Sequence, residues 1–185
     1  KALVVGIANE YSIAYGCARA FHEAGADVAI TYLNDKAKPH VEPLAKAVES
    51  PLFLPLDVSK PGDMEALFKR IKKEWGQLDI LVNCIGLNRE QLLLDVTEEA
   101  FDEVFAMNLK AAMFLAQAAA APLKACRGAI VNITDIHAEW PLKNYPLYCA
   151  AKAGLLGLTR ALALELAPEV RVNAVAPGPI AWPEN

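Results

Sequence analysis

Several features that mark other classes of protein are missing from this chain of 185 residues. Its lysines and arginines form no basic stripe and its net charge is −4, which argues against nucleic acid as a partner. No uninterrupted run of about twenty apolar residues is present, which argues against a membrane span. The sequence also lacks repeats, linkers and low-complexity segments, so we expect one domain over residues 1–185.

Cysteine and histidine are scarce and scattered. The four cysteines, Cys17, Cys84, Cys126 and Cys149, form no C-x-x-C pair. Their apolar surroundings predict reduced core thiols of a cytoplasmic protein. The three histidines lie far apart, so no metal site is expected from ligand spacing.

Apolar residues make up 55% of the chain, which suits a sheet that is buried on both faces. Short apolar runs predict strands at residues 2–5, 28–32, 52–56, 79–82, 129–133 and 170–175. Helical patterns alternate with them at residues 12–24, 38–49, 62–75, 98–104, 108–124 and 147–166. This alternation predicts right-handed βαβ crossovers and a Rossmann-type doubly wound α/β fold, with a parallel sheet of strand order 3-2-1-4-5-6 in three layers.

The first predicted strand ends in a glycine and leads directly into a helix. Gly6 permits a sharp turn and a close approach of the backbone to a ligand. Ser12 can cap the helix and donate to phosphate. The backbone N–H groups at a helix N-terminus favour a pyrophosphate. Because the spacing G-x-G-x-x-G is absent, an ordinary strand–loop–helix connection is the alternative.

Four polar residues in the second half have a spacing that suits proton transfer. Tyr148 and Lys152 are four residues apart, which places them on one face of a helix. Asp135 follows the fifth strand, and Asn108 stands at the head of another predicted helix. A nearby ammonium stabilises phenolate, so we expect Lys152 to lower the pKa of Tyr148 from its usual value of about 10. Lysine has donors enough to reach a ribose hydroxyl as well.

The order of glycine turn, Asp57-Val58, Asn83-Cys84-Ile85-Gly86, Asn108 and the Tyr-x3-Lys pair resembles the short-chain dehydrogenase/reductase superfamily. This resemblance implies an enzyme that uses NADPH or NADH. It also implies that Tyr148 is the acid, that Lys152 binds the ribose and tunes the tyrosine, and that Asn108 holds a water molecule in a proton relay.

The same resemblance implies that the cofactor binds along the carboxyl ends of the strands. The implied contact residues are Gly6, Ile7, Ser12, Ile13, Asp57, Val58, Cys84, Ile85, Gly86, Lys152, Pro177, Gly178 and Ile180. The choice of cofactor stays open after the second strand. There Asp35 could bind a ribose hydroxyl, and Lys36 or Lys38 could bind a 2′-phosphate.

Different parts of the chain resemble two different branches of the superfamily. Residues 1–82, with the G-x5-S-x-A turn from Gly6, resemble bacterial enoyl-acyl-carrier-protein reductases. Residues 95–184 resemble pteridine reductases and bacterial dihydromonapterin reductases, on the segments Asp135–Glu139 and Arg171–Glu184 and on Asp135 in place of the usual serine. A natural mosaic, a consensus sequence or an engineered chimera would each explain this division.

The pteridine reductase resemblance implies hydride transfer to a pterin-like small molecule. Asp135 would help Tyr148 to protonate a ring nitrogen, since a carboxylate pairs well with N–H donors. Asp135 could instead only cap a turn. Reduction of an enoyl thioester ranks second. Tyr145 has the Tyr-x6-Lys spacing of enoyl reductases, but that family's upstream tyrosine falls at Asp135.

Two further expectations concern the end of the chain and its assembly. Members of the superfamily continue beyond Trp182-Pro183-Glu184 with a substrate-covering segment, a strand and a helix, which implies a truncated chain. A scaffold that binds dinucleotide with little catalysis is therefore a third alternative. The apolar helices at 108–124 and 147–166 predict a homodimer or homotetramer, with packing on the sheet as the alternative.

Overall fold

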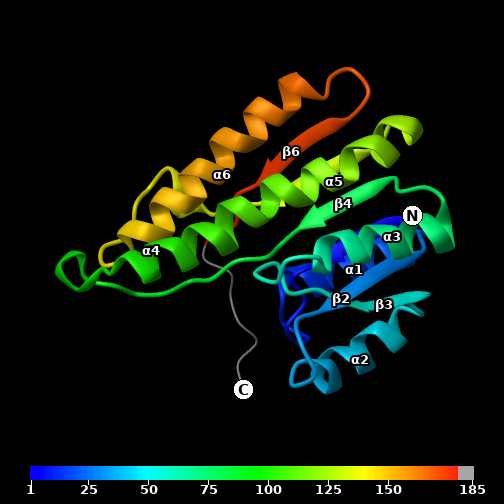
Figure 1. The fold of residues 1–185 in the computed structure, drawn as a ribbon, viewed down its shortest axis with the longest axis horizontal. Coiled ribbons are helices and arrows are strands. Elements are labelled where there is room, and N and C mark those ends of the chain that lie inside the picture. Colours follow the sequence, from blue (N-terminus) through cyan, green and yellow to red (C-terminus); the bar gives the residue numbers. More distant parts are fainter. Residues whose placement is uncertain (179–185) are drawn as a thin grey trace.

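The computed structural model, which describes residues 1–178, contains a six-stranded parallel sheet (Figure 1). The strands are β1 (Ala2–Val5), β2 (Val28–Tyr32), β3 (Leu52–Pro55), β4 (Ile80–Asn83), β5 (Ala129–Ile133) and β6 (Arg171–Val175). Their order is β3-β2-β1-β4-β5-β6, and all pairs are parallel. The predicted fold class and strand order are confirmed.

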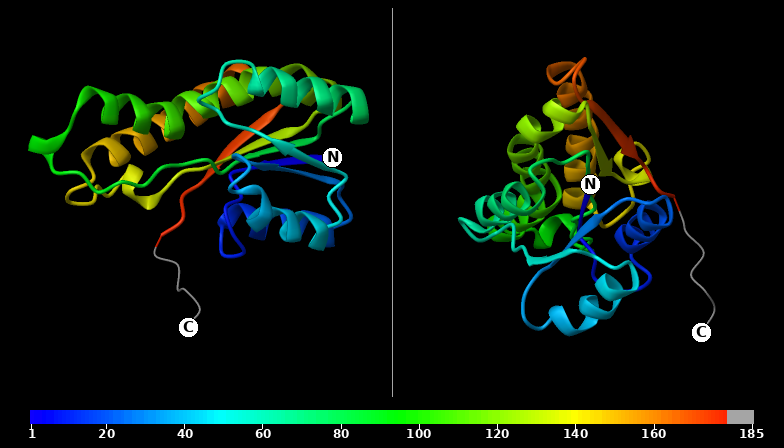
Figure 2. Two further views of the ribbon diagram at one scale, coloured as in Figure 1. Left: turned by 60° about the horizontal axis from the view of Figure 1, so that its bottom comes forward. Right: turned by 90° about the vertical axis from the view of Figure 1, so that its right-hand side faces the viewer.

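Helices cover both faces of the sheet and make the fold three-layered (Figure 2). They are α1 (Ile13–Glu23), α2 (Lys38–Ala47), α3 (Asp63–Trp75), α4 (Glu98–Phe105), α5 (Ala111–Cys126) and α6 (Pro146–Glu165). Buried side chains of α1 and α2 pack with Val4 and Ile30 on one face. Those of α3 and α5 pack with Leu3 and Leu81 on the other face.

Burial along the strands follows from this coverage. All four residues of β1 have no exposed surface, as a central strand between two helical layers requires. In β6, Val172 is buried but Val175 is half exposed. β6 lies at one edge of the described sheet, so double-sided burial, which we expected of every strand, holds only for the central ones.

The two helices that we expected near residues 98–104 and 108–124 are not separate. The chain is helical from Glu98 to Cys126, because α4 runs into α5 through a π-helical segment, Ala106–Lys110. No glycine or proline stands at this junction to end the first helix. Asn108 therefore lies inside a continuous helix rather than at its head, and a single-turn π segment inside an α-helix often marks a functional site.

The helix Glu98–Cys126 and α6 are both long and apolar enough to cross a membrane by length and composition alone. Buried core helices of globular proteins have the same composition. Leu115, Leu123 and Leu155 on these helices are at most 1% exposed, because they pack against the rest of the fold. This packing explains part of the apolar character of both helices, since 39% and 33% of their apolar windows are buried.

Candidate active site

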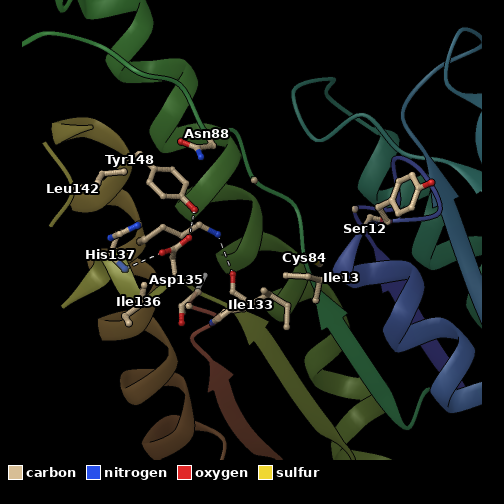
Figure 3. Close-up of a pocket in the computed structure, with 17 residues that line it drawn as sticks. Ser12, Ile13, Cys84, Asn88, Ile133, Asp135, Ile136, His137, Leu142 and Tyr148 are labelled. Carbon is tan, nitrogen blue, oxygen red and sulfur yellow. Dashed lines mark hydrogen bonds between the residues drawn. The ribbon is translucent and has the colours of Figure 1, made fainter. Parts of the chain in front are cut away.

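A cavity of about 790 Å³ lies at the carboxyl ends of the strands (Figure 3). Its volume falls within the range of about 300–1,000 Å³ that small-molecule sites occupy. The predicted site residues that line it are Gly6, Ser12, Ile13, Cys84, Gly86, Asp135, Tyr148, Lys152, Pro177 and Gly178. The βαβ topology thus brings together residues that are up to 172 positions apart in the chain.

Tyr148 and Asp135 are joined directly in this cavity. The Tyr148 hydroxyl donates a hydrogen bond of 2.6 Å to Oδ2 of Asp135. The other carboxylate oxygen, Oδ1, accepts the backbone N–H of His137 at 2.8 Å. The Asp135 carboxylate therefore caps the short 3₁₀ turn Ile136–Ala138 and also holds the tyrosine hydroxyl, so the expected cap is present without excluding contact with Tyr148.

The environment of Tyr148 raises its pKa, whereas we expected Lys152 to lower it. Burial has the largest effect, followed by the hydrogen bond to Asp135 and the charge of that carboxylate, all of which disfavour phenolate. The Lys152 ammonium lies 5.7 Å from the centre of the Tyr148 ring, but its Nζ donates to the Ile133 carbonyl at 3.0 Å. Tyr148 therefore holds its proton more tightly than a free tyrosine does.

Lys152 is 5% exposed, and its burial lowers its own pKa. One of its three ammonium protons is used by Ile133, and no other acceptor is within hydrogen-bond distance among residues 1–178. Its Nζ would lie 3.4 Å from a β-carbon placed on Gly86. The absence of a side chain at Gly86 keeps the cavity floor beside the ammonium open, so Lys152 has donors left for hydroxyl groups of a ligand.

The glycine turn has the tight geometry that a phosphate-binding loop requires. Gly6 has φ +101°, a conformation that favours glycine. A β-carbon at this position would lie 2.5 Å from the Cys84 carbonyl oxygen, so the β1 and β4 ends touch through bare backbone. Ser12 is the N-cap residue of α1, but its hydroxyl donates to the Asn9 carbonyl at 2.7 Å instead of capping the helix.

Asn108 is the one member of the predicted catalytic set that does not line the cavity. Its side chain is fully buried and donates to the Leu87 carbonyl at 3.0 Å and to the Val104 carbonyl at 2.9 Å. Its Oδ1 accepts the Leu87 N–H at 3.3 Å. The amide therefore clamps the loop after β4 to the π segment, and its side-chain groups are used in that clamp.

Some predicted cofactor residues have other surroundings. Ile7 is buried in the core beneath α1 and α2, and Val58 and Ile85 pack against the core beneath α3 and α5. Asp57 accepts hydrogen bonds from the side chain and the backbone of Ser59, and these contacts lower its pKa. It therefore organises the turn after β3. Ile180 lies outside the described residues.

Tyr145, the alternative acid, also lies outside the cavity lining. Its ring meets the Tyr148 ring edge to face, with the ring centres 6.4 Å apart. Tyr145 precedes α6 as its N-cap residue, whereas Tyr148 is 7% exposed and belongs to the cavity wall. The geometry thus favours Tyr148 over Tyr145 as the group that meets a substrate.

The cavity has further lining residues that the sequence analysis did not single out. They are Tyr11, Asn88, Ile133, Thr134, Ile136, His137 and Leu142. Thr134, Ile136 and His137 flank Asp135, so their position beside a strand end could have identified them. Asn88 and Leu142 come from loops, and no local pattern marks them.

Comparisons with known proteins agree on one family. The model of the family described as Enoyl-(Acyl carrier protein) reductase matches residues 6–185. The NADH-dependent enoyl-[acyl-carrier-protein] reductase FabI of Haemophilus influenzae is 38% identical, over 97% of this chain and 71% of that protein. The Escherichia coli FabI is 37% identical, with the same coverage of both chains.

Solved structures give the same result. The NADH-type enoyl-[acyl-carrier-protein] reductase of Aquifex aeolicus matches with a TM-score of 0.92 and 33% identity, over 98% of this chain and 74% of that one. The reductase of Anaplasma phagocytophilum, solved in complex with NAD, matches with a TM-score of 0.91 and 30% identity, over 97% and 70%.

These matches do not support the expected division of the chain between two families. The family model runs through both halves, and the similarity to FabI proteins covers nearly the whole chain rather than residues 1–82 alone. The chain therefore belongs to the enoyl-(acyl carrier protein) reductase family of the short-chain dehydrogenase/reductase superfamily, and it is an oxidoreductase of that kind.

Proposed function

We propose that this protein uses NADH to reduce the carbon–carbon double bond of an enoyl thioester carried by an acyl carrier protein. Family membership supports the reaction, and the cofactor and the substrate are those of the related FabI enzymes. The structural observation that carries the proposal is one cavity that holds the glycine turn at Gly6, the ammonium of Lys152 and the hydroxyl of Tyr148.

The residues present fit a dinucleotide. The bare backbone at Gly6 and the start of α1 provide N–H groups for a pyrophosphate. Lys152 retains donors for ribose hydroxyls, and Gly86 leaves the floor beside it open. Burial raises the pKa of Cys84 to about 11, so its thiol is neutral at pH 7 and adds no charge to this wall.

The side chains divide the chemistry between them. Bound NADH supplies the hydride that adds to the β-carbon of the enoyl group. Tyr148, which is protonated at neutral pH, delivers a proton to the enolate that remains on the thioester. Asp135 holds the tyrosine hydroxyl in place, and Lys152 orients the ribose.

A pterin-like substrate, our first expectation from the sequence, is now the second candidate. The comparisons favour enoyl reduction instead. One observation still favours a pterin: the Asp135 carboxylate beside Tyr148 suits a substrate with N–H donors better than one that develops negative charge on oxygen.

The deciding experiment is oxidation of NADH by the purified chain with crotonyl thioester and, separately, with dihydropterin. Turnover of the enoyl thioester is the expected result. Turnover of dihydropterin alone would overturn the proposal in favour of the second candidate. Saturable cofactor binding without turnover of either substrate would indicate a scaffold that binds dinucleotide with little catalysis.

NADH is proposed over NADPH on the names of the relatives. In the loop after β2, Oδ1 of Asn34 accepts hydrogen bonds from the N–H groups of Lys36 and Ala37, both at 3.0 Å. Lys38 lies over the Tyr32 ring, 5.7 Å from its centre. A ratio of kcat/KM for the two cofactors measures the preference directly, and a ratio in favour of NADPH would contradict the proposal.

We also propose that the protein is a cytoplasmic homodimer or homotetramer, which associates through α5 and α6. Met113, Phe114 and Leu164 on these helices are exposed, at 37%, 43% and 83%. The four cysteines are free, as in a reducing compartment. Sedimentation at micromolar concentration tests the assembly, and a monomeric profile would contradict it.

A further inference from the structure

His137 is a polar residue of the cavity lining that has no role in the proposed mechanism. Its Nδ1 lies 2.9 Å from the Trp140 carbonyl oxygen. A carbonyl can only accept, so the neutral ring carries its proton on Nδ1 and leaves a lone pair on Nε2. Nε2 has no hydrogen-bond partner within the described part of the chain, residues 1–178.

The position of His137 is fixed from two sides. Its backbone N–H donates to Oδ1 of Asp135, the carboxylate that also holds Tyr148. The preceding residue, Ile136, donates its N–H to the Pro177 carbonyl at 3.0 Å. The imidazole is thus held on a turn that is anchored to the Asp135 carboxylate and to the segment just after β6.

Asn88 supplies a second neutral polar group in the same cavity. It lies on the loop that Asn108 clamps through Leu87, and Figure 3 draws Asn88 and His137 on opposite sides of the Tyr148 ring. An amide side chain can both donate and accept. Leu142 adds an apolar surface to this part of the wall.

These groups suit a neutral ligand that carries both a donor and an acceptor. Of the charged groups of the cavity, Asp135 is engaged with Tyr148, and Lys152 keeps its remaining donors for the ribose of the cofactor. Among the lining residues that the proposed mechanism leaves unused are His137, with Nε2 as an acceptor, and Asn88, with its amide. A secondary amide has the matching N–H and C=O, and thioesters of acyl carriers bear such an amide in the arm next to the sulfur.

We propose that His137, together with Asn88, binds the amide of the thioester arm and so positions the enoyl group against Tyr148. The inference rests on the proposed function, because it assigns the substrate a carrier-type arm. His137 takes no part in hydride or proton transfer. Its loss is therefore expected to change KM and to leave kcat nearly unchanged.

Two substitutions separate substrate binding from a structural role. In His137→Asn the side-chain amide can take the place of Nδ1 and keep the bond to Trp140, but nothing replaces Nε2. In His137→Gln the amide reaches the position of Nε2, but the bond to Trp140 is lost. Asn88→Leu has a similar volume and removes the polar atoms of the other partner.

The experiment measures kcat and KM with two crotonyl thioesters of equal length. One is the N-acetylcysteamine thioester, which contains the amide, and the other is the S-pentyl thioester, which lacks it. We expect His137→Asn and Asn88→Leu each to raise KM for the first about three- to tenfold, as the loss of one neutral hydrogen bond predicts. For the S-pentyl thioester we expect no change, and His137→Gln should retain most of the affinity.

Equal effects on both thioesters, or damage by His137→Gln alone, would overturn the inference and leave His137 with a structural role in its turn. If the wild-type chain reduces neither thioester, the proposed function fails by itself. The inference is then decided by equilibrium binding of the saturated butyryl forms of the two thioesters. Preference of the wild type for the amide-bearing form, lost in His137→Asn, supports it, and equal binding of both forms overturns it.

Discussion

Oδ2 of Asp135 accepts the Tyr148 hydroxyl at 2.6 Å, while Oδ1 of the same carboxylate accepts the His137 N–H. Asp135, which holds the Tyr148 hydroxyl in place, is therefore itself oriented by a backbone N–H group. Because burial and the carboxylate both raise the pKa of Tyr148, the hydroxyl keeps its proton at neutral pH and the phenolate is disfavoured.

Replacement of Tyr148 by phenylalanine removes the proton donor and leaves the ring in place. We expect kcat to fall by about 10²–10⁴, the range for loss of a positioned general acid. NADH affinity should change little, because Lys152 keeps its bond to Ile133. Single-turnover kinetics and a fluorescence titration with NADH measure the two effects.

Tyr145→Phe is the matched control for this variant. Tyr145 contacts Tyr148 edge to face but does not line the cavity, so we expect its variant to keep most of the activity. The opposite pattern, with Tyr145→Phe inactive and Tyr148→Phe active, would transfer the role of the acid to Tyr145.

The pH dependence of the rate should report on Asp135. Burial and the Asp135 carboxylate both raise the pKa of Tyr148, so the acid is lost only as the pH rises through that raised value. Asp135→Asn removes the charge and leaves the burial. We therefore expect Asp135→Asn to lower the pKa of Tyr148 toward its ordinary value, so that kcat falls at a lower alkaline pH than in the wild type. If kcat falls at the same alkaline pH in both proteins, that fall reflects the titration of a group other than Tyr148.

The sequence predicts those parts of the fold that depend on repeated pattern. The apolar strands and their spacing predict the parallel sheet, and its topology alone brings Gly6, Asp135 and Tyr148 to one edge. The continuous helix through Asn108 could not be predicted in this way. Asparagine often stands at a helix end, yet the helix continues through Asn108 as a π segment from Ala106 to Lys110.

The loop side chains of the site were equally beyond prediction. Asn88 reaches the cavity because its loop is tied down by Asn108 at Leu87 and by a bond from the Gln91 N–H to the Asn144 carbonyl. Contacts of this kind join segments that are distant in sequence. The raised pKa of Tyr148 depends likewise on its burial and on the hydrogen bond to Asp135, and spacing along a helix determines neither.

Substitution of Asn108 tests its clamp. In Asn108→Leu the N–H and C=O of Leu87 lose their partners inside the protein, which should cost about 2–4 kcal/mol of unfolding free energy. We also expect a higher KM, because the loop that carries Asn88 is released. Urea unfolding measures the first effect. The control is Gln77→Ala, a change in an exposed amide that should stay within about 0.5 kcal/mol. Equal stability of both variants would refute the clamp.

Substitution of two glycines by alanine should have opposite effects. At Gly6 an added β-carbon would meet the Cys84 carbonyl at 2.5 Å, in a backbone conformation with φ +101°. We expect Gly6→Ala to lose about 1–3 kcal/mol of stability and to bind NADH more weakly, because β1 and β4 must move apart at the phosphate turn. Gly157 lies within α6 with nothing within 4 Å of the added atom, so Gly157→Ala should gain about 0.5–1 kcal/mol from helix propensity. Urea unfolding and an NADH titration of both variants provide the test. A Gly6→Ala protein with wild-type stability and affinity would show that the contact between Gly6 and Cys84 does not shape the cofactor site.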